Sequence, residues 1–183
     1  IAQNRPLREN FLAIVTCTML KIPLMICGKP GTSKTTAINI AEKLFELIVE
    51  EDKAKNSKYF KEAKGFIPIK YWGSVITTSV QVSEHFEMAA KKAEKTPDKN
   101  VQVVFDEIGL AELSPDNPLK VLHPLLEKKE RNVGFIGLSN WTLDLSKMNR
   151  MIYVAQADLD TTDLIDICKL TEKACFERDA DYR

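Results

Sequence analysis

The sequence predicts an α/β fold in which a parallel sheet of five strands carries helices on both faces. Short apolar runs, each about the length of a strand, alternate with segments in which apolar residues recur at helical spacing. Strands separated by helices pair in parallel, and such a sheet is covered on both faces. At 183 residues and 44% hydrophobic content, the chain is large enough for one domain with a sizeable core.

The charge balance and the cysteines exclude several classes of protein. Lys and Arg number 26, and Asp and Glu number 26, so the formal net charge is zero. A chain without a basic excess is a poor candidate for binding nucleic acid or an anionic membrane, and no apolar run approaches the length of a membrane span. The four cysteines form no CxxC pair, so we expect buried, reduced thiols in a cytoplasmic protein (Cys17, Cys27, Cys168, Cys175).

Each element is expected from its own pattern. Apolar residues at helical spacing predict helices over residues 6–20, 35–49, 80–94, 119–129 and 160–176, and a short helical turn over 145–149. Short, mainly apolar segments predict strands over residues 22–27, 65–72, 101–105, 133–139 and 151–155. The segment 110–118 ends in a proline and is assigned no element. Ligands of such sheets bind at the carboxyl ends of the strands, and polar residues follow three of these runs.

The first strand is followed by a phosphate-loop pattern, in which a glycine and four further residues precede Gly-Lys-Ser/Thr. Successive backbone N–H groups of such a loop wrap a phosphate at the positive end of a helix. Lys34 is expected on the phosphate oxygens and the Thr35 hydroxyl on Mg²⁺. Ser33 replaces the second glycine, so we expect an ordinary φ there. The expected nucleotide-binding residues are Gly28, Lys29, Pro30, Gly31, Thr32, Ser33, Lys34, Thr35 and Thr36.

An acidic pair follows the third strand. Asp106 is expected to bind Mg²⁺ through its water shell and Glu107 to polarise the water that attacks the γ-phosphate. On its own such a pair is common at solvated turns. Together with a phosphate loop about seventy residues earlier in the chain, it predicts a nucleotide hydrolase.

Two further residues complete the expected catalytic set. Asn140, just beyond the fourth strand, can hydrogen-bond the attacking water or the γ-phosphate, although an asparagine there can also cap the following turn. Arg150 precedes the fifth strand and is expected to point away from its own nucleotide, toward that of a neighbouring subunit, as an arginine finger does. A surface ion pair is the alternative, and Lys147 and Arg131 compete for the finger role.

The order of these motifs resembles that of the AAA+ ATPases, which are P-loop NTPases. Two longer regions resemble the mysterin-type giant RING-class E3 ubiquitin ligases, whose chains carry a dynein-like row of AAA+ modules. The first comprises DEIGLAELSP and PLKVLHPLLE, at residues 106–115 and 118–127. The second comprises VGFIGLSNW at residues 133–141, with LD at 143–144 and KMNR at 147–150. The phosphate loop of that family also has a serine before the lysine.

The resemblance extends from about residue 7 to residue 154 and implies a domain organisation. Residues 1–157 would form an AAA+ large subdomain, with an AAA+ type five-stranded sheet, and residues 158–183 the beginning of a helical lid. The chain departs from the family pattern at Leu145 and Ser146, which precede the KMNR string, and at Met151, where glycine is common. The family's RING-like Cys/His array is absent from these 183 residues, so ligase activity cannot be assigned to them.

The implied function is Mg²⁺-dependent ATP binding and hydrolysis, coupled to conformational change in a larger, ubiquitin-ligase-related protein. ATP is favoured over GTP because the chain lacks the Asn-Lys-x-Asp string that reads guanine. The implied partners are neighbouring AAA+ modules in the same chain or in a ring assembly, and ubiquitin-system proteins through the parent. A module that holds ATP without cycling is the alternative. A small-molecule kinase is disfavoured because no Arg-rich lid follows the core.

Overall fold

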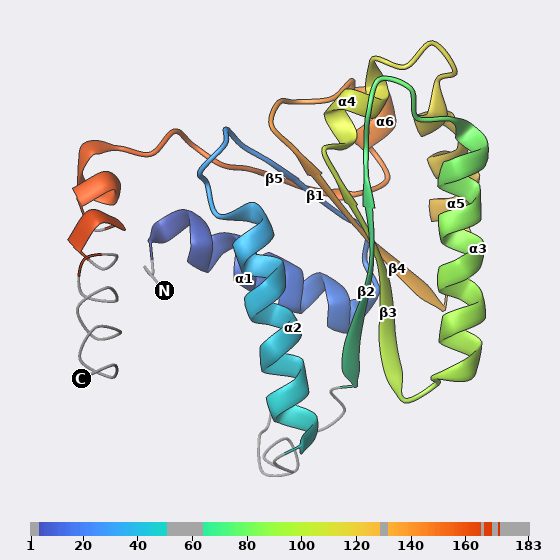
Figure 1. Ribbon diagram of the computed structural model, residues 1–183, viewed down its shortest axis with the longest axis horizontal. Coiled ribbons are helices and arrows are strands. Elements are labelled where there is room, and N and C mark those ends of the chain that lie inside the picture. Colours follow the sequence, from blue (N-terminus) through green and yellow to red (C-terminus); the bar gives the residue numbers. More distant parts are fainter. Residues whose placement is uncertain (1–3, 51–63, 129–131, 166, 170–171, 173–183) are drawn as a thin grey trace, which may run out of the picture.

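The structure is a computed structural model that describes residues 4–50, 64–128, 132–165, 167–169 and 172. Within these residues, five strands form one sheet, in the order β2-β3-β4-β1-β5, and every neighbouring pair is parallel (Figure 1). The strands are β1 (Leu24–Cys27), β2 (Gly65–Trp72), β3 (Lys99–Asp106), β4 (Val133–Ser139) and β5 (Ile152–Ala155). The expected fold class is confirmed.

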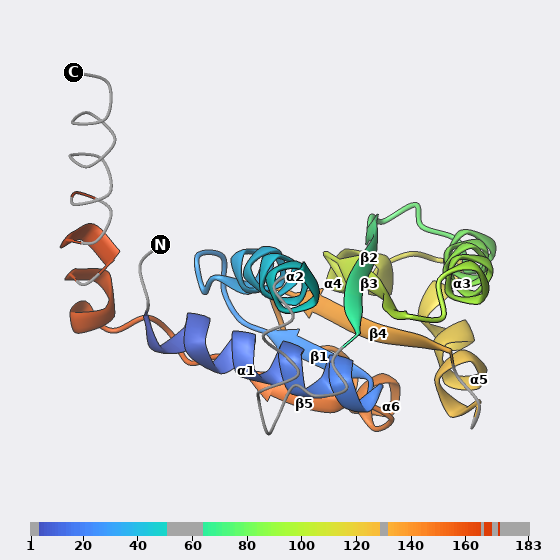
Figure 2. The same ribbon diagram turned by 90° about the horizontal axis from the view of Figure 1, so that it is seen from below.

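Helices cover both faces of this sheet. In Figures 1 and 2, α1 and α2 lie side by side on one face, and α3 and α5 lie on the other. The helical elements are α1 (Arg5–Leu20), α2 (Lys34–Glu50), α3 (Ser79–Lys95), α4 (Ile108–Glu112), the 3₁₀ helix η2 (Pro118–Val121), α5 (Leu122–Glu127) and α6 (Leu145–Met148). In the part of the chain that the structure describes, no helix combines the length and the apolar character needed to cross a bilayer.

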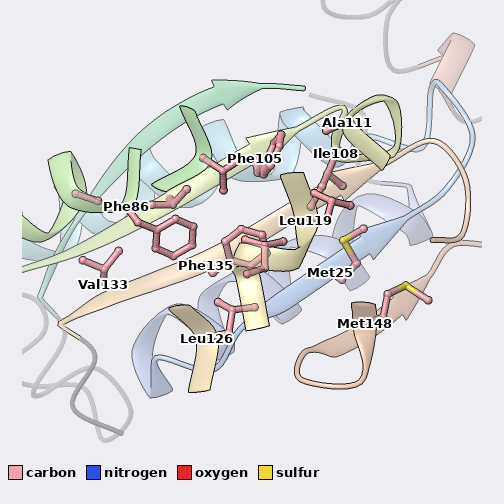
Figure 3. Close-up of a cluster of buried hydrophobic side chains, with 14 of the residues drawn as sticks. Met25, Phe86, Phe105, Ile108, Ala111, Leu119, Leu126, Val133, Phe135 and Met148 are labelled. Carbon is pink, nitrogen blue, oxygen red and sulfur yellow. The ribbon is translucent and has the colours of Figure 1, made fainter. Parts of the chain in front are cut away.

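The sheet separates two apolar cores because successive side chains of a strand point to opposite faces. In β1, Leu24 and Ile26 pack with α1 and α2, whereas Met25 packs with the cluster on the other face. Figure 3 shows this second cluster, where Phe86 of α3 stacks on Phe135 of β4 with ring centroids 5.8 Å apart. All seven residues of β4 are buried. The sheet is therefore firmly held at the strands that lead into the polar residues.

Local sequence signals explain where two of the long helices begin. The Asn4 side chain accepts a hydrogen bond from the Leu7 N–H at 2.8 Å and caps α1. Helix α3 begins with a capping box, in which the side chains of Thr78 and Gln81 each accept from the other's backbone N–H. Such caps satisfy N–H groups that a helix leaves without partners at its amino end.

Three expectations need correction. Helix α4 lies partly within the segment that was assigned no element. The helix expected over residues 119–129 is instead η2 followed by α5, because Pro118 starts a 3₁₀ turn and Pro124 is tolerated only in a first helical turn.

Cys17 and Cys27 are buried thiols, but Cys168 is exposed, and Cys175 lies outside the described residues. Of the expected helix 160–176, residues 161–165, 167–169 and 172 are helical, and the others within it from 166 onward are not described.

The topology gathers the polar residues at one end of the sheet. Strand β4 lies between β1 and β3, and all three run in the same direction. The loop after β1, the acidic pair at the end of β3 and Asn140 after β4 therefore follow the carboxyl ends of three adjacent strands. In Figure 1 the loop after β1 and helix α4 both lie toward the upper side of the view.

Candidate nucleotide-binding site

The loop between β1 and α2 is closed by its own hydrogen bonds. The Gly28 N–H donates to the Ser139 carbonyl at 3.1 Å, which ties the loop to the end of β4. The Thr32 hydroxyl donates to the Lys29 carbonyl at 2.9 Å, so this buried side chain turns back into the loop. Gly31 adopts a φ of 90°, a conformation that glycine accepts readily. The loop is thus shaped before any ligand arrives.

The backbone at Ser33 contradicts the expectation of an ordinary φ. Its φ is 60°, in the left-handed region, although it carries a Cβ. This conformation costs a residue other than glycine about 1–2 kcal/mol. The turn is needed because α2 starts at the next residue, and the Ser33 carbonyl already accepts from the Ala37 N–H at 3.0 Å. A serine here therefore adopts the conformation that the missing glycine would supply without cost.

Lys34 is the buried cation of the site, with 8% of its surface exposed. Its Nζ donates to the carbonyls of Gly28 at 2.5 Å and Lys29 at 3.1 Å, and to Oδ1 of Asn140 at 3.0 Å. Burial lowers the pKa of the Lys34 amine, although the carboxylates of Glu107 and then Asp106 act to raise it. All three donors of the ammonium group thus lie on protein oxygens.

The acidic pair lies directly across from the loop. The Thr35 hydroxyl donates to Oδ2 of Asp106 at 3.3 Å, and Oδ1 of Asp106 accepts from the Glu107 N–H at 2.9 Å. Glu107 is itself left-handed, with φ 52° and ψ 34°. Strained residues of this kind cluster at functional sites. The turn at Glu107 directs the chain from β3 into α4.

Asn140 joins the two halves of the site. Its Nδ2 donates to both carboxylate oxygens of Glu107, at 2.9 and 2.8 Å, while its Oδ1 accepts from Lys34. One amide therefore bridges a cation and an anion. The alternative expectation, that Asn140 only caps a turn, does not account for these contacts.

These side chains surround a hollow of about 360 Å³. Its lining consists of Pro30, Gly31, Ser33, Lys34, Thr35, Thr36, Asp106, Glu107 and Asn140. All nine belong to the residues that the sequence singled out. Of the remaining expected residues, Gly28 lies at the base of the loop, Thr32 turns inward, and Lys29 forms an exposed ion pair with Asp158 at 2.6 Å.

Arg150 lies apart from this hollow. It comes two residues before β5, at the amino end of that strand, whereas the loop follows the carboxyl end of neighbouring β1. Its Nε donates to Glu127 at 2.5 Å, and a second nitrogen donates to Asn149 at 2.9 Å. Lys147, a competitor for the finger role, is paired with Glu112 at 2.9 Å, and Arg131 lies outside the described residues.

A buried polar link behind the phosphate loop was not predicted from the sequence. Asn10 of α1 is fully buried, and its Nδ2 donates to the Thr32 carbonyl at 2.9 Å. Its Oδ1 accepts from the Gln156 side chain at 2.9 Å, just beyond β5. The available signal was an asparagine on the apolar stripe of a helix, between Leu7 and Ile14. Such a buried amide needs partners, so its position could have indicated a contact with another segment.

Comparison with known proteins identifies the family. A family model described as "RNF213 AAA domain" matches residues 1–163. The chain belongs to the RNF213 AAA domain family. The E3 ubiquitin-protein ligase RNF213 of Homo sapiens is 38% identical over 182 residues. The match covers 92% of this chain and 3% of that protein. The E3 ubiquitin-protein ligase rnf213-beta of Danio rerio is 38% identical over 177 residues, which cover 91% and 3%.

The chain therefore corresponds to about 3% of the length of these RNF213 relatives. The expected membership in an AAA+ module of such ligases is confirmed. Two solved structures share the fold of this RNF213 AAA domain. C. elegans PCH-2 has a TM-score of 0.55 at 18% identity, covering 87% of this chain and 45% of its own. A point variant of Thermotoga maritima RuvB has a TM-score of 0.51 at 13% identity, covering 90% and 50%.

Proposed function

We propose that this RNF213-type AAA+ domain binds ATP with Mg²⁺ and hydrolyses it, and that the cycle drives conformational change in a larger, ubiquitin-ligase-related protein. One observation carries the proposal: Lys34, Glu107 and Asn140 are joined by hydrogen bonds around a hollow lined by a phosphate loop. A cation, a carboxylate and an amide that converge at the amino end of a helix suit a triphosphate and its attacking water.

The residues fit a magnesium ion. The Thr35 hydroxyl and the Asp106 carboxylate face each other and offer oxygen donors, which Mg²⁺ prefers. When bound, Mg²⁺ neutralises charge that develops on the phosphate oxygens. In this proposal Thr35 and Asp106 hold the ion, and Asp106 keeps its position because the Glu107 N–H also donates to it.

The proposed role of Lys34 is to bind the phosphate oxygens together with the loop amides. In the free protein its ammonium group lies on two loop carbonyls and on Asn140, so a triphosphate would replace these neutral partners with charged ones. Because burial disfavours the charged amine, the anionic ligand relieves a cost that is present in the free protein. This arrangement favours triphosphate binding.

Glu107 is proposed as the base that polarises the attacking water, and Asn140 as the group that positions water or the γ-phosphate. In the free protein, Nδ2 of Asn140 donates a hydrogen bond to each oxygen of the Glu107 carboxylate. Each oxygen keeps a further lone pair, so these contacts do not block a proton but fix the direction in which the carboxylate points. Turning the carboxylate toward an attacking water would open at least one of them. Competition of the γ-phosphate for Asn140 and Lys34 would open them, which would link hydrolysis to the presence of a triphosphate.

The contacts between Asn140 and Glu107 also support a second function, in which the domain holds ATP as a scaffold and does not hydrolyse it. If the Asn140–Glu107 contacts persist with nucleotide bound, the carboxylate stays directed at the amide and is not turned toward the attacking water. The two functions differ in whether turnover depends on Glu107.

Turnover and binding in the full-length parent protein test the proposal. We expect Glu107→Gln to bind ATP as the wild type does but to lose this site's turnover by about 10²–10⁴-fold, the usual contribution of a general base. Lys34→Ala should lose ATP binding at this site. Glu84→Gln, an exposed carboxylate change on α3, is the control and should alter neither quantity. Turnover unchanged in Glu107→Gln would reject hydrolysis and favour the holding function.

The wider organisation belongs to the same proposal. Residues 1–157 would be the nucleotide-binding subdomain and residues 158–183 the start of a helical lid. Arg150 would serve a neighbouring AAA+ module of the same chain or ring, as its position at the other end of an adjacent strand supports. Ubiquitin-system proteins would be partners through the parent. The free thiols of Cys17 and Cys27 support a location in the cytoplasm.

A further inference from the structure

Glu107 needs an explanation for its backbone. A left-handed residue with a long side chain is unfavourable, and it persists only where the surroundings hold it. Two contacts on its own segment contribute: its N–H donates to Asp106, and its carbonyl accepts from the Leu110 N–H at 2.9 Å. These contacts leave open what lies against the outer side of the turn.

Gly73 lies against the outer side of the turn at Glu107. The β2–β3 ladder ends with Trp72 opposite Asp106, and the next N–H, that of Gly73, donates to the Asp106 carbonyl at 2.8 Å. The chain leaving β2 therefore runs against the peptide of Glu107. A Cβ at position 73 would overlap the Glu107 carbonyl oxygen, and it would lie 3.0 Å from the Glu107 carbonyl carbon and from the Phe105 ring. Only a glycine fits this approach.

The loop that begins at Gly73 is tied to the chain that follows Glu107. The Ser114 hydroxyl, just after α4, donates to the Thr77 carbonyl at 2.7 Å, and both residues are buried. Asp116 accepts from the Ser79 N–H at 2.6 Å and from its hydroxyl at 2.9 Å. Residues 73–79 and 107–116 are thus held together at both ends, so a displacement of one segment is transmitted to the other.

We infer that Gly73 is a positioning residue for the Glu107 carboxylate. The inference rests on the proposed function of Glu107 and adds a residue outside the motifs of the site. Gly73 holds the Glu107 peptide in its left-handed turn, and that turn aims the carboxylate at Asn140. A side chain at position 73 displaces the Glu107 carbonyl and moves the carboxylate. The atoms nearest to such a Cβ belong to Glu107 and Phe105 and not to the loop at residues 28–36, so phosphate binding stays intact.

The test is a split between kcat and KM in the full-length parent protein. We expect Gly73→Ala to lower kcat by about 10- to 100-fold, because a displacement of about 1 Å at a reacting group has this effect. The KM for ATP and the affinity for a fluorescent ATP analogue should stay within about twofold. Gly65→Ala is the matched control, because the atoms nearest to its Cβ would belong to the flexible Lys99 side chain, at 3.4 Å or more, and kcat should not change.

Two further variants make every outcome decisive. Glu107→Gln in the same assay measures the turnover that this site contributes. If Glu107→Gln removes no turnover, the proposed function and the inference both fail; if it does and Gly73→Ala retains wild-type kcat, only the inference fails. If Gly73→Ala does not fold, Ser114→Ala takes its place, since it removes the hydroxyl's contacts with the Thr77 carbonyl and the Asp116 N–H without adding an atom. It must also lower kcat with KM unchanged, and an unchanged kcat overturns the inference.

Discussion

Replacing Asn10 with alanine should weaken both the fold and the phosphate loop. Asn10→Ala removes two hydrogen bonds of 2.9 Å and leaves the carbonyl of buried Thr32 without its partner. A neutral hydrogen bond contributes about 1 kcal/mol, and an unpaired buried group costs about 1–3 kcal/mol. Gln156 is only half-buried and can turn to water, so we expect a loss of about 2–4 kcal/mol in the free energy of unfolding. For a chain of this size, Tm should fall by about 5–15 °C.

The effect on nucleotide binding separates this link from an ordinary buried amide. Without the Thr32 anchor the loop is less preordered, and we expect ATP affinity to fall about tenfold, which corresponds to about 1.4 kcal/mol. Thermal unfolding and calorimetric ATP titration of the 183-residue chain measure the two quantities. Asn100→Ala is the control, because this buried amide makes one long contact of 3.5 Å to Lys64, away from the loop. It should lower Tm slightly and leave ATP affinity unchanged.

Two results would refute this reasoning. One is a wild-type Tm in Asn10→Ala, which would mean that the link adds nothing to stability. The other is an equal loss of ATP affinity in Asn10→Ala and Asn100→Ala, which would mean that the loss reflects general destabilisation.

Three other predictions concern charge. The pKa of Lys34 is lowered, so its amine loses its proton at a lower pH than an ordinary lysine, and calorimetric ATP affinity should fall as the pH rises through that lowered pKa. Because the unfolded chain keeps this proton up to the ordinary lysine pKa, the Lys34 contribution to the free energy of unfolding should rise over the same window. Lys34→Ala, which should not bind ATP, should lack this rise in stability. Mg²⁺ should increase ATP affinity in the wild type but not in Asp106→Asn, and an equal Mg²⁺ effect in both would exclude Asp106 as a ligand. Arg150→Ala in the parent should lower turnover by up to about 10³-fold with ATP affinity at this site unchanged, whereas reduced affinity here would place the arginine on its own nucleotide.

Apolar content was sufficient to place the strands. Residues 65–72 and 133–139 were expected as strands, and β2 and β4 have these bounds. Both segments are rich in apolar and aromatic residues, which favour strands. Helix α4 was missed because its five residues include Gly109 and span little more than one turn. So short a helix depends on what it packs against, and local sequence does not carry that information.

The clustering of the candidate site was predictable where a motif names a residue type, and less so where geometry depends on distant contacts. The lysine and the acidic pair were expected to lie together because they follow the ends of parallel strands, and the structure brings them around one hollow. The left-handed turn at Glu107 depends on Gly73, which enters from the end of another strand, far earlier in the chain. The support of Thr32 by Asn10 joins a helix to a loop 22 residues away. The Gly73 contact leaves no local pattern, and the position of Asn10 on an apolar helix stripe indicates that it has a partner but not which one.

The most direct test of the proposed nucleotide site is a crystal structure of the chain with Mg²⁺ and a non-hydrolysable ATP analogue. We expect the triphosphate in the hollow, Lys34 and Asn140 within hydrogen-bond distance of the γ-phosphate, and the ion between Thr35 and Asp106. A nucleotide bound elsewhere, with Lys34 still on the Gly28 carbonyl and Asn140 still on both oxygens of Glu107, would contradict it.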